Sequence, residues 1–129
     1  MLSDAEWKKK LAPEAYHVMR EAGTERSGTS SHNNEKREGV FHCKGCDWEL
    51  FSSEAKFDSG TGWPSFYQPI SDKAIGTTVD RKLIYARTEE HCANCGSHLG
   101  HIFDDGPKPT GKRHCINGIA LVFKPAEVG

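Results

Sequence analysis

The order of apolar and polar residues divides the chain into a helical beginning and a longer region of short apolar segments. Near the start, Ser3 and Glu6 have the spacing of a helix capping box. Pro13 is a favoured first residue for a second helix through EAYHVMREA, and Gly23 would end that helix. The pattern therefore predicts two short helices before residue 23.

Residues 23–39 and the region after Val40 differ in composition. Residues 23–39 are polar and rich in Ser, Gly and Asn, which is typical of a long surface loop. After Val40, the apolar segments have lengths that favour strands: GVFHC, WELF, GTGWPSF, RKLIYART (residues 81–88) and CINGIALVF (residues 115–123). The last segment is apolar on both faces toward its end, so it predicts one central, buried strand.

Length and charge narrow the class of protein. A chain of 129 residues predicts a single domain over residues 1–129. The 17 Lys and Arg against 18 Asp and Glu give a formal net charge of −1, which offers no attraction to nucleic acid or to an anionic membrane. The chain has no apolar run long enough to span a bilayer, and MLSDAEWKKKL is too polar for a secretory signal. We expect a cytoplasmic protein.

Four of the five cysteines form two CxxC pairs, Cys43 with Cys46 and Cys92 with Cys95. Two such pairs supply four thiolates for a tetrahedral zinc ion. The alternative is two redox pairs, but a thioredoxin-type motif opens a helix within a βαβ pattern, which neither pair has. Four thiolates leave no position for a water ligand, so the predicted zinc is structural and its binding would stabilise the fold.

Cys115 is the fifth cysteine. A buried cysteine is often an inert small apolar residue. In an extended segment, however, Arg113 and Asn117 would share the face of Cys115. A cation and an amide donor beside a thiol predict a lowered pKa and a reactive sulfur.

Two further clusters carry possible chemistry. His98 and His101 directly follow the second CxxC pair and could be proton donors or solvated surface residues. The glycine-rich segment of residues 58–66 carries Trp63 and Phe66, which could contact a small apolar group of a substrate or pack in the core.

Together these segments resemble the type B peptide-methionine sulfoxide reductases. The resemblance covers most of the chain and rests on LAPEAYHVMREAGTE, the two CxxC pairs, FDSGTGWPSF, CGSHLGHIFDDGP and RHCINGIAL in the family's order. It implies a mainly β fold, with two antiparallel sheets around a buried core, short N-terminal helices and the zinc-knuckle pair. It also implies reduction of the R epimer of methionine sulfoxide, free or protein-bound, to methionine.

The resemblance further implies a role for each candidate residue. Cys115 would be the nucleophile and would become a sulfenic acid, while Trp63 would receive the methyl group of the sulfoxide. The sulfoxide oxygen must be protonated as it leaves, and histidine is a suitable donor at neutral pH. Implied to lie near that oxygen, or to hold the polar network around it, are His98, His101, Asp105, Arg113 and Asn117.

The chain departs from the family in the tryptophan loop. Many members read SGCGWPSF, with a resolving cysteine, whereas this chain has Thr61 at that position. With four cysteines assigned to zinc, no internal thiol remains to resolve Cys115. We therefore predict a one-cysteine cycle in a monomer, with thioredoxin, glutaredoxin or a small thiol as the reductant.

Two other classes of zinc protein share part of this pattern. A zinc-ribbon module that binds protein or nucleic acid would account for the CxxC pairs, but not for Cys115, Trp63 and the two histidines. A zinc hydrolase needs an open position on the metal, which four thiolates do not leave. The reductase is therefore the favoured interpretation.

Overall fold

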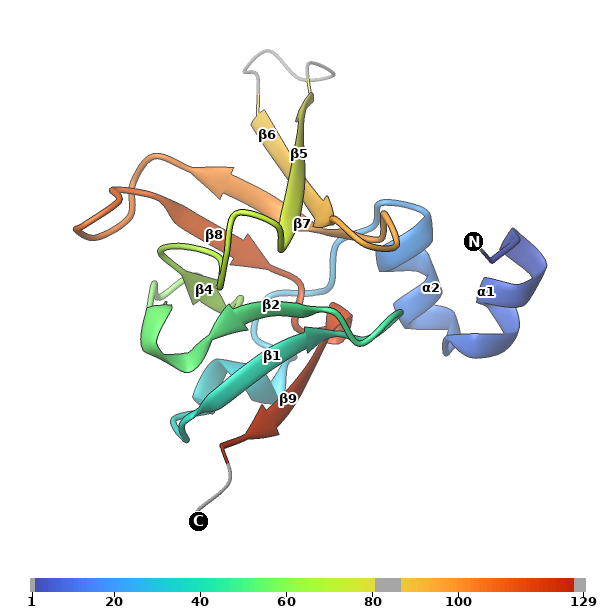
Figure 1. Ribbon diagram of the computed structural model, residues 1–129, viewed down its shortest axis with the longest axis horizontal. Coiled ribbons are helices and arrows are strands. Elements are labelled where there is room, and N and C mark those ends of the chain that lie inside the picture. Colours follow the sequence, from blue (N-terminus) through green and yellow to red (C-terminus); the bar gives the residue numbers. More distant parts are fainter. Residues whose placement is uncertain (1, 81–86, 127–129) are drawn as a thin grey trace.

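The N-terminal part is helical, as the sequence predicts. The computed structural model describes residues 2–80 and 87–126 (Figure 1). Helix α1 spans Asp4–Lys10, and the predicted capping box between Ser3 and Glu6 is present. Helix α2 spans Pro13–Arg20 and ends earlier than expected, because Ala22 adopts a left-handed φ of 55°. Within the described ranges, no helix has the length and apolar character that a membrane crossing requires.

The strands described after residue 38 form two antiparallel sheets, which confirms the predicted fold class (Figure 1). The smaller sheet has the order β2-β1-β9, with β1 at Gly39–Cys43, β2 at Glu49–Ser52 and β9 at Leu121–Pro125. The larger sheet has the order β3-β4-β8-β7-β6-β5. Its strands are β3 (Lys56–Phe57), β4 (Ser65–Phe66), β5 (Ile75–Asp80), β6 (Arg87–Cys92), β7 (His98–Phe103) and β8 (Arg113–Ile116).

The predicted single strand over residues 115–123 is wrong. Strand β8 ends at Ile116, a short 3₁₀ helix, η3, follows at Gly118–Ala120, and β9 continues in the other sheet. The break lies at Asn117, whose amide nitrogen Nδ2 donates to the carbonyl oxygen of Leu99. Cys115 therefore lies near the end of β8 in the larger sheet. The predicted strand over residues 81–88 lies outside the described residues except for Arg87 and Thr88, which begin β6.

The core lies between the two sheets and continues under the helices. Phe51 and Phe66 stack with ring centroids 4.4 Å apart, and Phe41 meets Phe66 edge-on at 5.1 Å. Trp7 of α1 and Met19 of α2 are also buried. Because burial of such side chains contributes about 1.5–3 kcal/mol each, this cluster fixes how the two sheets pack. It thereby fixes the position of β8.

Loop 23–39 lies on the surface, as predicted, and contains a second 3₁₀ helix, η1, at Ser31–Asn34. None of its residues is fully buried. It is nevertheless hydrogen-bonded to the rest of the fold: His32 Nε2 lies 3.1 Å from the carbonyl oxygen of Leu121, and Asn33 Nδ2 donates to the carbonyl oxygen of Gly62 at 2.9 Å. The predicted surface loop is therefore held to the fold by side-chain hydrogen bonds.

Candidate active site and metal centre

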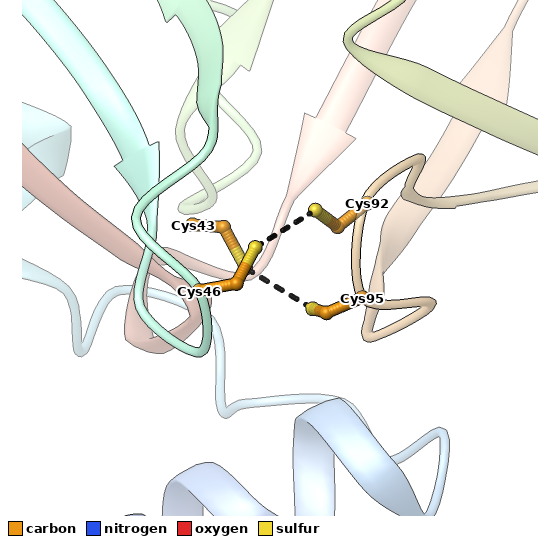
Figure 2. Close-up of side chains that lie close together, drawn as sticks. All are labelled: Cys43, Cys46, Cys92 and Cys95. Atoms are coloured by element: carbon orange, nitrogen blue, oxygen red, sulfur yellow. Dashed lines mark hydrogen bonds between the residues drawn. The ribbon is translucent and has the colours of Figure 1, made fainter. Parts of the chain in front are cut away.

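The two CxxC pairs meet in space although they are far apart in the sequence (Figure 2). The four sulfur atoms lie within 4.8 Å of one another. The Sγ atoms of Cys43 and Cys95 are 3.7 Å apart, and those of Cys46 and Cys92 are 3.5 Å apart. Sulfurs at the corners of a tetrahedron around zinc, with Zn–S of about 2.3 Å, would be about 3.8 Å apart. The geometry therefore fits a tetrahedral metal site.

The two pairs lie on separate turns that have the same hydrogen-bond pattern. The amide nitrogen of Asp47 donates to the carbonyl oxygen of Cys43 at 2.8 Å, and that of Gly96 donates to the carbonyl oxygen of Cys92 at 2.9 Å. Asp47 and Gly96 both have positive φ, at 67° and 76°. In each turn the positive φ falls on the residue that directly follows the second cysteine. Equivalent turns present the sulfurs to one common point.

The four neighbouring thiols favour the binding of a cation once they ionise. Hydrogen bonds with the thiols of Cys92 and Cys95, followed by burial, raise the pKa of Cys43 well above its usual range. All five cysteines are free thiols. Ionising four neighbouring thiols, three of them buried, requires a compensating positive charge, which a bound divalent metal would provide. The donor set and the spacing therefore both suit a thiolate-binding metal.

Cys115 lies on the opposite face of β8 from the core. The exposure of β8 alternates, with Arg113 and Cys115 partly exposed and the residues between and after them buried. Cys115 pairs with His101 of β7 on one side and with Ser65 of β4 on the other. It opens into a pocket of about 250 Å³. The pocket is lined by Thr24, Thr61, Trp63, Gly100, His101, Phe103, Arg113, Cys115 and Asn117.

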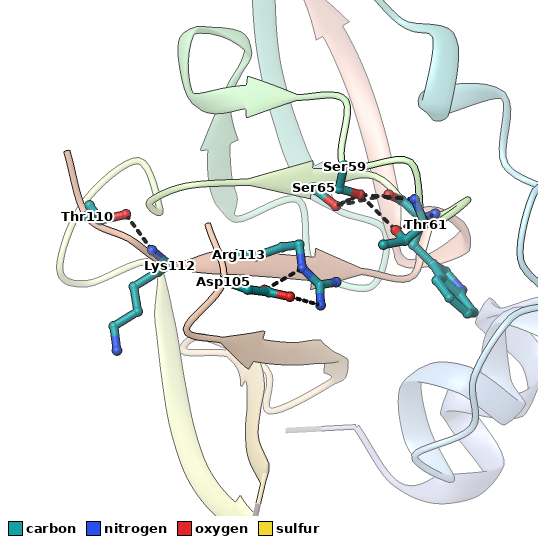
Figure 3. A network of polar contacts seen from close by, with 8 residues as sticks. Ser59, Thr61, Ser65, Asp105, Thr110, Lys112 and Arg113 are labelled. Atoms are coloured by element: carbon teal, nitrogen blue, oxygen red, sulfur yellow. Dashed lines mark hydrogen bonds and ion pairs between the residues drawn. The ribbon is translucent and has the colours of Figure 1, made fainter. Parts of the chain in front are cut away.

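Arg113 is held in place from two directions. Its Nε and Nη2 atoms donate to the two carboxylate oxygens of Asp105 at 2.8 and 3.1 Å (Figure 3). Its guanidinium also lies over the ring of Phe103, 4.3 Å from the centroid. The hydrogen bond with Arg113 lowers the pKa of Asp105, so this carboxylate stays charged. Asp105 thus orients Arg113 at the pocket and does not line the pocket itself.

The electrostatic environment of Cys115 differs from the sequence prediction. Burial raises the pKa of the Cys115 thiol, and this outweighs the lowering by the charge of Arg113 and by a hydrogen bond with Thr61. The expected net lowering is therefore wrong. Asn117 is 3% exposed and lines the pocket, and its amide nitrogen Nδ2 donates to the carbonyl oxygen of Leu99.

Comparison with known proteins identifies the family. The SelR domain model matches residues 11–125. The peptide methionine sulfoxide reductase MsrB of Methanosarcina barkeri is 55% identical over 129 residues, covering 98% of this chain and 89% of the relative. MsrB of Agrobacterium fabrum is 50% identical over 123 residues, covering 95% and 91%. The chloroplastic reductase B1 of Arabidopsis thaliana is 53% identical over 127 residues, covering 98% and 62%.

The chain belongs to the SelR family. The resemblance seen in the sequence is thereby confirmed. This SelR chain brings Trp63, His101 and Arg113 into one pocket with Cys115, and it places the four remaining cysteines in a separate cluster.

Besides Asp105, two residues named in the sequence as site candidates do not line the pocket of this SelR domain. Phe66 is 0% exposed and stacks on Phe51, so the prediction that it contacts substrate is wrong and the core alternative holds. His98 lines a neighbouring hollow with Glu90, and its ring meets that of His101 edge-on at 5.5 Å. His98 therefore contacts His101 but does not line the Cys115 pocket.

A chain of hydroxyl groups that the sequence did not reveal leads to the pocket (Figure 3). Ser65 Oγ donates to Ser59 Oγ at 2.8 Å, and Ser59 Oγ lies 2.8 Å from Thr61 Oγ1. Thr61 in turn lowers the pKa of the Cys115 thiol by acting as a hydrogen-bond donor to it. Aligned hydroxyl groups polarise one another, so the last one becomes a stronger donor. The only signal in the sequence was the concentration of Ser and Thr between residues 59 and 65.

Glu25, also missed in the sequence, connects loop 23–39 to the pocket. Its carbonyl oxygen accepts from Trp63 Nε1 at 3.1 Å, and its amide nitrogen donates to Asn117 Oδ1 at 2.9 Å. Its carboxylate accepts from the amide nitrogen of Ile119 at 2.8 Å. Glu25 thereby fixes two walls of the pocket, and the polar composition of the loop is used in these hydrogen bonds.

Proposed function

We propose that this protein reduces the R epimer of methionine sulfoxide to methionine, with Cys115 as the nucleophile. Relatives at 50% and 55% identity over nearly the whole chain are peptide methionine sulfoxide reductases, which supports the reaction class. The observation that carries the proposal is the pocket in which Cys115, Trp63, His101 and Arg113 meet. It combines a sulfur nucleophile, an aromatic wall, an imidazole and a cation around a space of about 250 Å³.

In the proposed reaction, the thiolate of Cys115 attacks the sulfur of the sulfoxide. The sulfur–oxygen bond of the substrate breaks, the oxygen gains a proton, and a sulfur–oxygen bond forms on Cys115. Two electrons pass from the cysteine sulfur to the substrate sulfur. The products are methionine and the sulfenic acid of Cys115, the first step of cysteine oxidation.

Three pocket residues would orient the substrate. The indole of Trp63 is fixed by its hydrogen bond to Glu25 and offers a surface for the methyl group, since sulfur groups pack well on aromatic rings. His101 lies directly across from Cys115 and would receive the oxygen. A chiral sulfur with its methyl group and oxygen held at two fixed walls presents one epimer to Cys115, which supports a preference for a single epimer.

We assign the proton donor to His101, because it lines the pocket and His98 does not. His101→Gln is expected to lower kcat/KM about 100- to 1,000-fold and to remove the limb of the pH-rate profile that falls as the donor deprotonates. His98→Gln is expected to retain that limb and to lower the rate less. A profile with both limbs intact in His101→Gln would contradict the assignment.

The hydroxyl of Thr61 is expected to stabilise the thiolate of Cys115. Burial already raises the pKa of this thiol and Thr61 lowers it, so Thr61→Val should raise the pKa further. The rising limb of kcat/KM, which follows formation of the thiolate, should then move to higher pH. Thr61→Ser keeps the hydroxyl and should leave the limb in place. Identical profiles for the Val and Ser variants would show that the hydroxyl has no such effect.

We further propose that a thiol from outside the chain resolves the sulfenic acid. The first external thiol would form a mixed disulfide with Cys115 and release water, and a second would restore the Cys115 thiol and leave as a disulfide. Thioredoxin, glutaredoxin and small thiols fit this role. The support is that the pocket contains Thr61 beside Cys115, and the other four thiols lie in the metal cluster.

Peptide mapping tests this one-cysteine cycle. After one turnover without reductant, Cys115 is expected to carry one added oxygen or a dimedone adduct, with no peptide cross-linked to it. A disulfide between Cys115 and any of the other four cysteines would contradict the one-cysteine cycle. The reaction class would still stand in that case.

We propose that the four-cysteine cluster binds one zinc ion. The ion would neutralise the thiolates and link the turn after β1 to the turn after β6. Cys43, Cys46, Cys92 and Cys95 would fill its coordination sphere, so it would have a structural role. The metal content of the purified protein, measured by elemental analysis, tests this directly.

The reaction itself is tested by turnover. Purified protein with dithiothreitol and methionine sulfoxide is expected to form methionine in amounts that exceed the enzyme concentration. Protein that contains its metal but forms no methionine would contradict the proposed function.

A further inference from the structure

A carboxylate, an imidazole and a thiol form one row across three neighbouring strands of the larger sheet, β6, β7 and β8. In the strand register, Glu89 of β6 lies opposite His101 of β7, and His101 lies opposite Cys115 of β8. Side chains of directly opposed residues share one face of a sheet. Glu89 therefore lies on the face that carries the nucleophile, and it has no role in the reaction described above.

The carboxylate of Glu89 is close enough to act on His101 through its charge. Its Oε1 atom lies 3.9 Å from Nε2 of His101. This distance is longer than a hydrogen bond, so the two groups attract each other when the imidazole is protonated. The side chains of Glu89 and His101 are 29% and 15% exposed, so solvent screens this attraction only in part. A carboxylate in this position favours the charged form of the imidazole, which is the form that a proton donor needs.

The next residue of β6, Glu90, serves the opposite face of the sheet. Its Oε2 atom lies 2.7 Å from Nδ1 of His114, and its side chain is 0% exposed. Consecutive residues of a strand point to opposite faces, so Glu90 is directed away from His101. The carboxylate that β6 offers to the imidazole at the pocket is therefore that of Glu89.

The charged and titratable groups that face His101 come from three strands. They are Glu89 of β6, His98 of β7, and Arg113 and Cys115 of β8. The positive charge of Arg113 would oppose protonation of the imidazole, but its two hydrogen bonds to Asp105 balance that charge. The residues that line the pocket from the two adjoining loops are uncharged: Thr24, Thr61 and Trp63. Glu89 thus supplies the carboxylate that stabilises a protonated His101.

We propose that Glu89 is a positioning residue for the reaction at Cys115, because its carboxylate orients His101 and keeps the imidazole charged until the proton passes to the sulfoxide oxygen. This inference rests on the proposed function and adds a residue to it. Glu89 does not line the Cys115 pocket, so it acts through His101 and does not touch the substrate.

The first test needs no turnover. NMR titration of the histidine ring protons follows His101, whose signal is identified by its absence in His101→Gln. In Glu89→Gln, which removes the charge and keeps the size, the His101 titration midpoint is expected about half to one pH unit lower. Glu49→Gln removes the same charge from an exposed position on β2 and should leave the midpoint unchanged. Equal midpoints in wild-type and Glu89→Gln protein would overturn the proposal.

The second test separates a positioning role from a merely structural one, by the pH profile of methionine-R-sulfoxide reduction with dithiothreitol. In Glu89→Gln, the limb that falls as the donor deprotonates should move to lower pH. On that limb kcat should be about three- to tenfold lower, with KM changed less than about twofold. Glu89→Asp keeps the charge, so its limb should lie closer to that of the wild type. A loss that is uniform across pH, or identical profiles for the Gln and Asp variants, would overturn the proposal.

The two tests distinguish failure of this inference from failure of the proposed function. If wild-type protein turns over but neither the His101 midpoint nor the falling limb depends on Glu89, the proposed function stands and the role of Glu89 is wrong. If the midpoint depends on Glu89 but the protein reduces no methionine sulfoxide, the proposed function fails, and the catalytic part of this inference fails with it. Melting curves of the Glu89 and Glu49 variants verify that each protein is folded.

Discussion

Replacing Cys115 with Ser is expected to lower kcat/KM for methionine sulfoxide at least about a thousandfold. A serine hydroxyl is far less nucleophilic than a thiolate, and its oxygen cannot take up the substrate oxygen as a sulfenic acid does. The measurement is methionine formed by wild-type and Cys115→Ser protein with dithiothreitol in excess. Because Cys115 lies in a pocket away from the sulfur cluster, the metal content should be the same in both proteins.

Metal content and thermal stability serve as controls for this variant. Ser is close to Cys in size, so Cys115→Ser should keep the pocket and the fold. Ser65→Ala removes the first hydroxyl of the chain to Thr61 but keeps the nucleophile, so it should lower the activity far less than Cys115→Ser does. Activity of Cys115→Ser above about a hundredth of the wild-type value would show that another group attacks the substrate.

The second large effect concerns the four-cysteine cluster, which we propose binds zinc. Cys92→Ser is expected to lose the bound metal and to lower the free energy of unfolding by about 5 kcal/mol or more, a large part of the stability of an ordinary domain. Cys43 and Cys92 are 1% and 0% exposed and lie in the core cluster that both sheets share. Losing the metal would therefore separate the turn of β1 from that of β6. Urea unfolding and elemental analysis of the same samples measure both effects.

A chelator provides an independent check of the same account. Metal removal from the wild-type protein should reproduce the loss of stability, and added zinc should restore it. In Cys92→Ser, zinc should have little effect on the unfolding midpoint. A variant that still binds one zinc ion per chain, or that unfolds at the wild-type urea concentration, would contradict the structural role of the cluster.

Local spacing in the sequence was enough to predict several features. The capping box of Ser3 and Glu6 and the helix start at Pro13 depend only on residues within one turn, so the structure reproduces them. The CxxC pairs were equally predictable, because two thiols on a tight turn face the same way whatever the rest of the fold does. The convergence of the two pairs followed from the chemistry of a four-thiolate site.

Features that depend on tertiary contacts were harder to predict. The alternating pattern of residues 115–123 describes two strands as well as one, and only the hydrogen bond from Asn117 to Leu99 marks the point where the chain changes sheets. Phe66 and Trp63 lie on one short segment, but the first packs on Phe51 in the core and the second lines the pocket. An aromatic residue alone does not show which of these it will do.

The electrostatics of Cys115 show the same limit. Arg113 was correctly placed beside the thiol, but the sequence did not show how deeply the thiol is buried, and burial decides the net direction of its pKa shift. The contributions of Glu25 and Thr61 were also hidden. Glu25 acts through a long-range hydrogen bond that Trp63 Nε1 donates to its carbonyl oxygen, and Thr61 acts at the end of a chain of hydroxyl groups.

The most direct test of the central claim is turnover of the separated R and S epimers of methionine sulfoxide by the purified protein with dithiothreitol. The account predicts reduction of one epimer only, because Trp63 and His101 would hold the methyl group and the oxygen at two walls of the pocket. The resemblance to the type B reductases makes the R epimer the one that is reduced to methionine. Equal reduction of both epimers, or reduction of the S epimer alone, would contradict it.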